Sequence, residues 1–151
     1  MTREELQSRL PELSEGLTFI EGGEWLNMEV DAAGFKSLAK SLKSTAGFDF
    51  DYLFCLTCVD WKTHLTMVYH LTSTSHRHTV VVKVKLDRNK SEIETVCDIW
   101  RTAEFHEREV YELFGVNFLN HPDLRRLILP DEWDGFPLRK DYEDPINMIK
   151  L

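Results

Sequence analysis

Residues 52–86 read YLFCLTCVDWKTHLTMVYHLTSTSHRHTVVVKVKL, and this stretch decides the fold. It divides into three strand-like runs, Tyr52–Trp61, His64–Thr72 and Arg77–Leu86, and the last two alternate apolar with polar side chains. Such alternation predicts a sheet with one covered face and one face that is wetter or is covered by something else. The first run is apolar on both faces, so we expect it to be a central strand.

Shorter elements are predicted on the N-terminal side of this stretch. A capping-box pattern at residues 2–5 predicts a short helix, which the proline at position 11 should end or kink. Two apolar runs on either side of a Gly-Gly pair, 17–21 and 25–30, predict a β-hairpin. Asp31 is placed to cap a second helix that carries a single apolar stripe.

A third helix is predicted on the C-terminal side of the strands, from about Thr102 to Phe114, and Gly115 is its expected stop. The resulting order, αββαβββα, indicates an α+β fold, a two-layer domain with a mixed or antiparallel sheet. We expect this domain to span residues 1–116 and to be followed by an extended, irregular C-terminal arm at 117–151.

The arm (117–151) differs from the domain in composition. It holds four of the five prolines and shows little hydrophobic periodicity, yet it is rich in Arg, Trp, Phe and Tyr. Disordered tails are poor in aromatic residues, whereas aromatic and Arg side chains are enriched where proteins contact one another. The sequence therefore predicts that the arm is a docking segment.

The overall charge excludes two classes of partner. The chain has 151 residues, with 18 basic and 26 acidic side chains and a formal net charge of −8. This balance argues against a nucleic-acid binder, which needs a basic surface, and against a polybasic contact with anionic lipid. No segment has the apolar character of a secretory signal or the length of a membrane span. We expect a soluble chain that reaches a membrane only through a partner.

The three cysteines, Cys55, Cys58 and Cys97, are candidate ligands or reactive thiols. The first two form a C-x-x-C pattern within a predicted strand, where residues three apart point to opposite faces. Core packing is therefore favoured over a metal or redox role. An ordinary iron–sulfur cluster takes four thiolates, and this chain has too few. A free-standing metal or thiol enzyme that uses Cys55, Cys58 and His106 is the remote alternative.

The third predicted helix is rich in carboxylates but lacks the partners of a metal site. A zincin helix would need a second histidine where Val110 stands, and a di-iron site needs Glu-x-x-His pairs on several helices. The simpler interpretation is an acidic helix that faces solvent or a partner. On that interpretation Arg108 pairs with Glu104 or Glu112, four residues away on the same helix.

Three sequence blocks near the C-terminus carry a specific resemblance. They are EREVYELFGV at Glu107–Val116, HPDLRRLIL at His121–Leu129 and PLRKDY at Pro137–Tyr142. In this order the blocks resemble the C subunit of the proton-pumping NADH:quinone oxidoreductase family, respiratory complex I. Two departures are Glu112, where the family commonly has Asp, and Glu143, where it often has Pro.

The resemblance implies a scaffold subunit with no catalytic residue, cofactor or metal of its own. Members of the family lie in the peripheral arm of the complex, on the cytoplasmic side of the bacterial inner membrane. The implied partners are the quinone-site D subunit and the cluster-bearing B and I subunits, while FMN and Fe–S clusters in other subunits carry electrons from NADH to quinone. An equivalent scaffold subunit of a membrane-bound hydrogenase or another donor:quinone complex is the alternative.

The resemblance also assigns docking to the motif residues. Arg125, Arg126 and Arg139 are expected to make bidentate pairs across the interface, and Gly115 and Pro122 to set turns. The expected buried anchors are Phe114, Leu124, Trp133, Phe136 and Tyr142. The predicted interface residues are Glu107, Arg108, Glu109, Tyr111, Phe114, Gly115, His121, Pro122, Asp123, Leu124, Arg125, Arg126, Trp133, Phe136, Pro137, Leu138, Arg139, Lys140, Asp141 and Tyr142.

Overall fold

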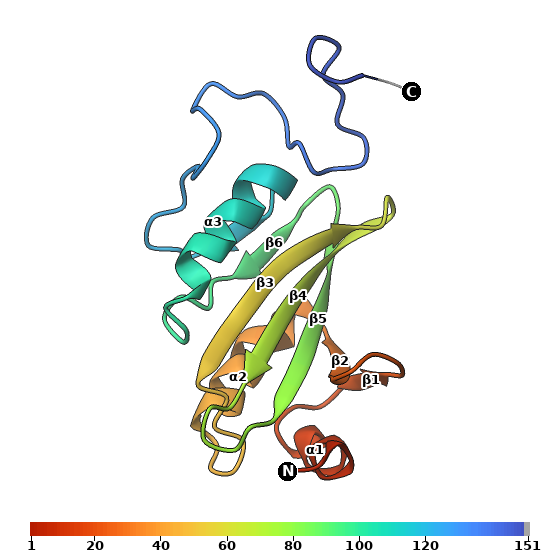
Figure 1. The fold of residues 1–151 in the computed structure, drawn as a ribbon, viewed down its shortest axis with the longest axis vertical. Helices are drawn as coiled ribbons and strands as arrows, with labels where there is room; N and C mark the ends of the chain where they lie inside the picture. Colours follow the sequence, from red (N-terminus) through yellow and green to blue (C-terminus); the bar gives the residue numbers. More distant parts are fainter. Residues whose placement is uncertain (150–151) are drawn as a thin grey trace.

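The computed structural model describes residues 1–149 and has the α+β architecture that the sequence predicts (Figure 1). The helices are α1 (Arg3–Arg9), the 3-10 turn η1 (Leu10–Glu12), α2 (Ala32–Ser44) and α3 (Ala103–Phe114). The strands are β1 (Thr18–Ile20), β2 (Leu26–Val30), β3 (Tyr52–Asp60), β4 (His64–Thr72), β5 (Thr79–Asp87), β6 (Glu92–Glu94) and β7 (Asn117–Leu119).

Five strands form one mixed sheet in the order β1-β2-β5-β4-β3. Only the β2–β5 pair within this sheet is parallel, and the other neighbours are antiparallel. Strand β3 therefore lies at an edge, and the expectation of a central strand is wrong. A strand can be apolar on both faces at an edge when another element covers it, and here α3 packs against β3.

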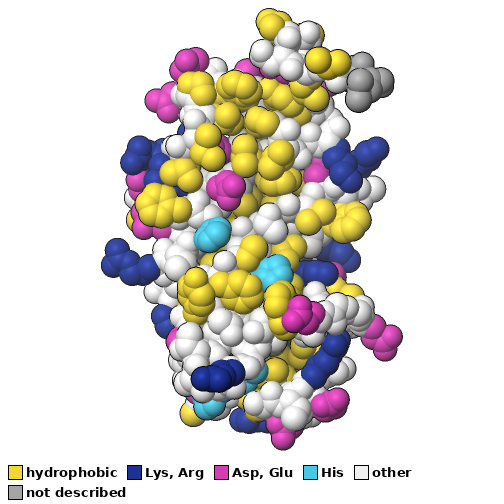
Figure 2. Space-filling model, viewed as in Figure 1, with side chains coloured by type: hydrophobic (Ala, Val, Ile, Leu, Met, Phe, Trp, Pro, Cys, Tyr) yellow, Lys and Arg dark blue, Asp and Glu magenta, His cyan; other side chains and the backbone are white. Residues whose placement is uncertain are grey.

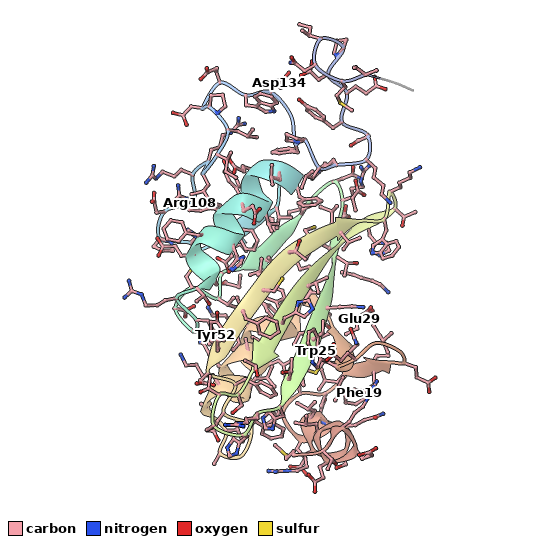
Figure 3. The ribbon with its side chains drawn as sticks, in the orientation of Figure 1. Phe19, Trp25, Glu29, Tyr52, Arg108 and Asp134 are labelled. Atoms are coloured by element: carbon pink, nitrogen blue, oxygen red, sulfur yellow. The ribbon has the colours of Figure 1, made fainter. Side chains whose placement is uncertain are left out.

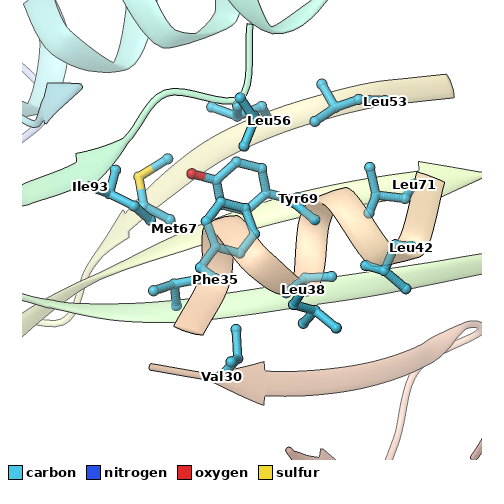
Figure 4. Close-up of a cluster of buried hydrophobic side chains, with 14 of the residues drawn as sticks. Val30, Phe35, Leu38, Leu42, Leu53, Leu56, Met67, Tyr69, Leu71 and Ile93 are labelled. Atoms are coloured by element: carbon cyan, nitrogen blue, oxygen red, sulfur yellow. The ribbon is translucent and has the colours of Figure 1, made fainter. Parts of the chain in front are cut away.

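Helix α2 covers one face of the sheet and forms the core with it (Figure 4). The register pairs Met67 with Val84 and Tyr69 with Val82, so the predicted apolar sides of β4 and β5 point the same way. The ring of Phe35 on α2 lies 4.4 Å from the ring of Tyr69, centroid to centroid. No helix of the described residues covers the opposite face of the sheet.

The predicted helix ends are confirmed in their details. Thr2 and Glu5 form a reciprocal capping box at the start of α1. Asp31 accepts a hydrogen bond from the Gly34 backbone N–H at the start of α2, at 2.8 Å. Helix α3 ends at Gly115, whose φ of 74° is the left-handed conformation of a helix C-cap.

A second, two-stranded parallel sheet was not predicted. It pairs β6 with β7, so that Ile93 lies opposite Phe118. Each of these strands has only three residues, too few for a period-2 pattern to stand out. Because β7 occupies Asn117–Leu119, the first residues of the predicted arm belong to the folded domain, and Phe118 is buried in its core.

No helix within residues 1–149 is long and apolar enough to cross a membrane. The longest, α2, has 13 residues and α3 has 12. A spanning helix needs about 20 apolar residues.

Candidate functional site: the contact between helix α3 and the arm

Helix α3 carries three charged side chains that are almost completely buried. The exposed fractions are 0% for Glu107, 4% for Arg108 and 1% for Glu112. The prediction of an acidic helix that faces solvent or a partner, with Arg108 paired to Glu104 or Glu112, is therefore wrong for these residues. Arg108 makes no ion pair with a described residue, because backbone groups of the arm take its hydrogen bonds.

The Glu112 carboxylate is surrounded by backbone donors from the arm. It accepts hydrogen bonds from the N–H groups of Leu127 and Ile128 at 3.0 Å and of Leu129 at 3.1 Å. Successive N–H groups that converge in this way form an anion-binding nest, and hydrogen bonds to an ionised acceptor are stronger than neutral ones. One side chain of α3 thereby fixes the backbone of the HPDLRRLIL block.

Arg108 binds the residues of the same block that come just before those bound by Glu112. Its Nε donates to the Arg125 carbonyl and its Nη2 to the Arg126 carbonyl, each at 3.0 Å. The guanidinium also lies 5.4 Å from the ring centroid of Phe105. In Figure 3, Arg108 extends from α3 toward the arm. Arg108 thus donates to carbonyls of the arm, and Glu112 accepts from its N–H groups. We call this pair of residues the clasp.

The PLRKDY block is fixed at the C-terminal end of α3. The Leu138 N–H donates to the Leu113 carbonyl at 3.0 Å, and Arg139 Nε donates to the Phe114 carbonyl at 2.6 Å. These carbonyls belong to the last turn, whose acceptors have no partner within the helix. The Arg139 guanidinium lies 5.2 Å from the ring centroid of Phe136, and that ring rests directly on Gly115. The arm therefore completes the capping of α3.

A third contact joins the arm to the end of β3. Asp60, 3% exposed, accepts hydrogen bonds from Nε and Nη2 of Arg88 and from the Lys62 and Lys140 backbone N–H groups. Arg88 also pairs with Asp141 of the arm at 3.1 Å. Burial by itself raises the pKa of Asp60, but the bonds from Arg88 and from the two backbone groups outweigh it and lower that pKa to about 2.

Replacing Asp60 with asparagine is expected to lower the stability of the protein in a pH-dependent way. A carboxyl group with a lower pKa in the folded than in the unfolded state stabilises the folded protein at pH values above its unfolded pKa. This contribution to the free energy of unfolding is lost as the pH falls through the folded pKa. The window for Asp60 therefore lies between its ordinary pKa of 3.8 and about 2. Urea unfolding of the two proteins should differ most near neutral pH and should converge toward pH 2. A difference that stays constant across this range would contradict the assignment.

Glu107 ties α3 to the segment before it. Its carboxylate accepts hydrogen bonds from the Val96 N–H at 2.8 Å, from the Thr95 hydroxyl and from the Cys97 thiol. Burial raises the pKa of Glu107, although these donors oppose the rise. The Nε2 atom of His121 lies 3.7 Å from the same carboxylate. Cys97, Glu107 and His121 thus place three metal-type donor atoms within 4.8 Å of one another.

The hydrogen bonds of His121 argue against a metal at this cluster. Its Nδ1 accepts a bond from the Asp123 N–H at 3.0 Å, so the ring hydrogen is on Nε2, which lies 3.1 Å from the Glu104 carbonyl. A metal-bound imidazole would need a free lone pair on Nε2. Burial raises the pKa of the Cys97 thiol to about 12, and the thiol donates its hydrogen to Glu107. These residues are best described as a hydrogen-bonded support beneath the arm.

The structure does not bring together the residues of the thiol-enzyme alternative. Cys58 faces the core at 5% exposure, where burial raises the pKa of its thiol to about 12. Cys55 is half-buried, and burial raises the pKa of its thiol as well. Among residues 1–149, the one group of three metal-type donors is that of Cys97, Glu107 and His121, so Cys55, Cys58 and His106 form no such group.

The other predicted interface residues take varied positions. Phe114 lies in the core of this chain, and Tyr111 and Leu124 pack against that core. Trp133 is half-buried, with an indole N–H that has no partner among the described residues. Arg125 is exposed and pairs with Asp123 at 2.9 Å. The exposed members are Pro122, Asp123, Arg125, Leu138, Lys140 and Asp141. Their role in docking stays a prediction.

The arm exposes large apolar side chains, of which only Leu138 was among the predicted interface residues. Ile128 is 70% exposed and Leu138 is 52% exposed. The large exposed apolar side chains of the arm are Leu119, Leu127, Ile128, Leu138, Ile146, Met148 and Ile149. Figure 2 shows hydrophobic side chains gathered on the upper part of the molecule, where α3 and the arm lie. Contiguous exposed apolar surface is typical of an interaction site.

Known relatives cover most of the chain. The C subunit of the NADH-quinone oxidoreductase of Moorella thermoacetica is 39% identical over 92% of this chain and 91% of that protein. The C subunit of the F(420)H(2) dehydrogenase of Methanosarcina mazei is 39% identical over 93% of this chain and 89% of that protein. The C/D subunit of the NADH-quinone oxidoreductase of Phocaeicola vulgatus is 46% identical over 73% of this chain, which spans only 22% of that longer protein.

Two solved structures share the fold. A chain of the membrane-bound sulfane sulfur reductase, an archaeal respiratory membrane complex, superposes with a TM-score of 0.79 at 27% identity, covering 93% of this chain and 85% of that one. A trypsin-resistant fragment of Nqo5 superposes with a TM-score of 0.67 at 26% identity, covering 80% of this chain and 98% of the fragment. Residues 28–146 match the family described as the respiratory-chain NADH dehydrogenase 30 kDa subunit. As the three sequence blocks predicted, the chain belongs to this family, that of the C subunit of NADH-quinone oxidoreductase-type complexes.

Proposed function

We propose that this chain is a non-catalytic scaffold in the peripheral arm of a proton-translocating NADH:quinone oxidoreductase. The observation that carries the proposal is the arm itself. Buried side chains of α3 fix its backbone, while several of its large apolar side chains remain exposed. A segment that is ordered by its own domain and apolar on the outside is prepared for docking, because little conformational entropy remains to be lost on binding.

The quinone-site D subunit is the proposed main partner. The Phocaeicola vulgatus relative is named a C/D subunit, and 46% identity links it to this chain. Fusion of two subunits in one protein supports their proximity in the proteins that keep them separate. Contacts with the cluster-bearing B and I subunits are part of the same proposal, as is a peripheral location on the cytoplasmic side of the bacterial inner membrane.

The redox cofactors are proposed to belong to partner subunits. FMN and Fe–S clusters there would carry electrons from NADH to quinone, and this chain would hold the subunits in place. Support comes from the groups that the chain already uses internally. The buried carboxylates of Glu107 and Glu112 accept hydrogen bonds from its own backbone.

The same scaffold in a complex with another electron donor is the second candidate. It is favoured by the F(420)H(2) dehydrogenase relative and by the sulfane sulfur reductase chain, each of which covers 93% of this chain. The two candidates differ in the donor-oxidising subunits that accompany the chain. Purifying the complex from native membranes and assaying quinone reduction with NADH and with reduced F420 would separate them.

Replacing Ile128 with aspartate is expected to reduce recovery of the D subunit with the tagged chain by about tenfold or more, since burying an unpaired charge at an interface is costly. The side chain is 70% exposed in the chain itself, so the melting temperature of the variant should stay within about 2 °C of the wild type. The measurement is co-purification from native membranes followed by quantitative mass spectrometry.

The matched control is Ala33→Asp, which adds the same charge at an exposed position of α2. It should leave the recovery of the D subunit unchanged. Equal recovery with Ile128→Asp and with Ala33→Asp would rule out the arm as the docking surface. Catalytic turnover of NADH by the isolated chain, with a stoichiometric flavin or cluster, would refute the non-catalytic assignment.

A further inference from the structure

The face of the main sheet opposite α2 is hollowed and partly apolar. A concavity of about 500 Å³ lies on it, lined by outward-pointing residues of β2, β3, β4 and β5. Val68 and Val81 form its floor and are 7% and 3% exposed, while Trp61 at one end is 56% exposed. In Figure 3, Trp25 and Glu29 are labelled on this same side of the sheet, in front of the strands. We call this surface the open sheet face.

Two buried polar atoms on this face lack hydrogen-bond partners among the described residues. They are the hydroxyl of Thr66 and the Nδ1 atom of His70, both on β4. Buried polar side chains nearly always have a partner, and leaving one unpaired costs free energy. Four residues along a strand separate the two atoms by about 13 Å. One small anion is too short to reach both, whereas a peptide segment laid along β4 is long enough.

A lysine lies between these two positions, and none of residues 1–149 forms an ion pair with it. Lys83 of β5 is opposite Val68 in the register and is half-buried. Its neighbour in the adjacent strand, Glu29, pairs instead with Lys85, at 3.0 Å. Burial and the charge of Lys83 lower the pKa of His70, so that ring is neutral near pH 7. The open sheet face therefore presents two lysines, Lys83 and Lys85, against the single carboxylate of Glu29, beside neutral polar groups. This local excess of positive charge contrasts with the net charge of −8 of the whole chain.

We propose that the open sheet face binds an apolar segment of a partner subunit that carries a carboxylate, with the carboxylate against Lys83 and polar groups of the segment bonded to Thr66 and His70. Charge complementarity selects an acidic segment, because Lys83 is half-buried and forms no ion pair with a described residue, and the neighbouring Glu29 carboxylate already pairs with Lys85. The apolar floor and Trp61 select apolar side chains beside it. This inference rests on the proposed function, since it assumes that the chain works within a complex.

The direct test is photo-crosslinking within the native complex. A photo-reactive phenylalanine analogue placed at Trp61 is expected to crosslink to one segment of a partner subunit, and mass spectrometry should find Asp or Glu in that segment. The control places the same analogue at Ala33, on the exposed side of α2, and should not capture that segment. Subunits that co-purify without any crosslink from position 61 would overturn the inference, as would a crosslink to a second copy of this chain or to lipid.

A charge exchange tests the role of Lys83. Lys83→Glu is expected to lower recovery of the crosslinked subunit by about tenfold, because a like charge would face the partner's carboxylate. Changing that carboxylate residue to lysine in the partner should restore recovery. Lys40→Glu makes the same change on α2 and should have no effect. The inference would be overturned if Lys40→Glu lowered recovery as much as Lys83→Glu does. It would also be overturned if the lysine in the partner failed to restore recovery with Lys83→Glu. A failure of any subunit to co-purify with the wild-type chain would instead refute the proposed function.

Discussion

Replacing Glu112 with alanine is expected to detach the HPDLRRLIL block from α3. The carboxylate accepts hydrogen bonds from three successive N–H groups of Leu127, Ile128 and Leu129. Hydrogen bonds to charged groups contribute about 1.5–3 kcal/mol each, and the three share one acceptor, so we expect a loss of about 3 kcal/mol for arm attachment. Amide hydrogen exchange at these three residues should then become faster by about 100-fold.

Glu109→Ala is the matched control on the same helix. Glu109 is half-buried, and its side chain takes no part in the hydrogen bonds and ion pairs that hold the arm. Its removal should therefore leave exchange in the arm within about twofold of the wild type. Exchange in β4 and β5 should stay slow in both variants, because the clasp lies outside the sheet. If Glu112→Ala left the three amides as protected as before, the carboxylate would not be what holds the arm.

Replacing Gly115 with alanine is expected to destabilise the folded protein by about 2–5 kcal/mol. Two costs combine, the left-handed backbone with a φ of 74° and the collision of the new Cβ with Phe136, whose ring atoms would lie 2.6–2.8 Å away. A non-glycine residue in this conformation costs about 1–2 kcal/mol, and overpacking adds about 1–3 kcal/mol. Urea unfolding of the purified chain measures the sum.

Two further variants separate the two costs. Gly22 has a φ of 99°, and nothing lies within 4 Å of the Cβ that an alanine would add there. Gly22→Ala should therefore lower the free energy of unfolding by the backbone cost alone. In a Phe136→Ala background, Gly115→Ala should lose its steric cost and cost only about 1–2 kcal/mol. Equal effects of Gly115→Ala in the two backgrounds would show that Phe136 does not pack against this glycine.

Much of the fold was predictable because local rules decide it. Period-2 alternation located β4 and β5, and side-chain capping located the starts of α1 and α2. The edge position of β3 was not predictable from its sequence. A strand with apolar residues on both faces can be buried either between two other strands or at an edge against a helix, and the pattern does not distinguish the two. The pairing of β6 with β7 was missed for a different reason, because three-residue strands joined across α3 leave no periodic signal.

The sequence blocks drew attention to part of the candidate site, but they did not single out Glu112 as a site residue and did not predict the contacts. The three sequence blocks singled out Glu107, Arg108 and Arg139, yet pairing rules within one helix led Arg108 to the wrong partners. Its actual partners are backbone carbonyls of the arm, and every residue type offers such carbonyls. Composition alone therefore cannot identify them. Cys97 was not expected to lie beside Glu107, because no motif spacing connects the two.

Docking through the arm is tested most directly by hydrogen exchange of this chain in its native complex and after its release. We predict that those arm amides at residues 130–149 that make no hydrogen bond within the chain exchange at least about tenfold more slowly in the complex, because a partner covers them. Amides at 127–129 should be protected in both states, because Glu112 holds them within the chain. Arm amides that exchange equally fast in both states, while other surfaces of the chain become protected, would contradict the claim that the arm is the docking element.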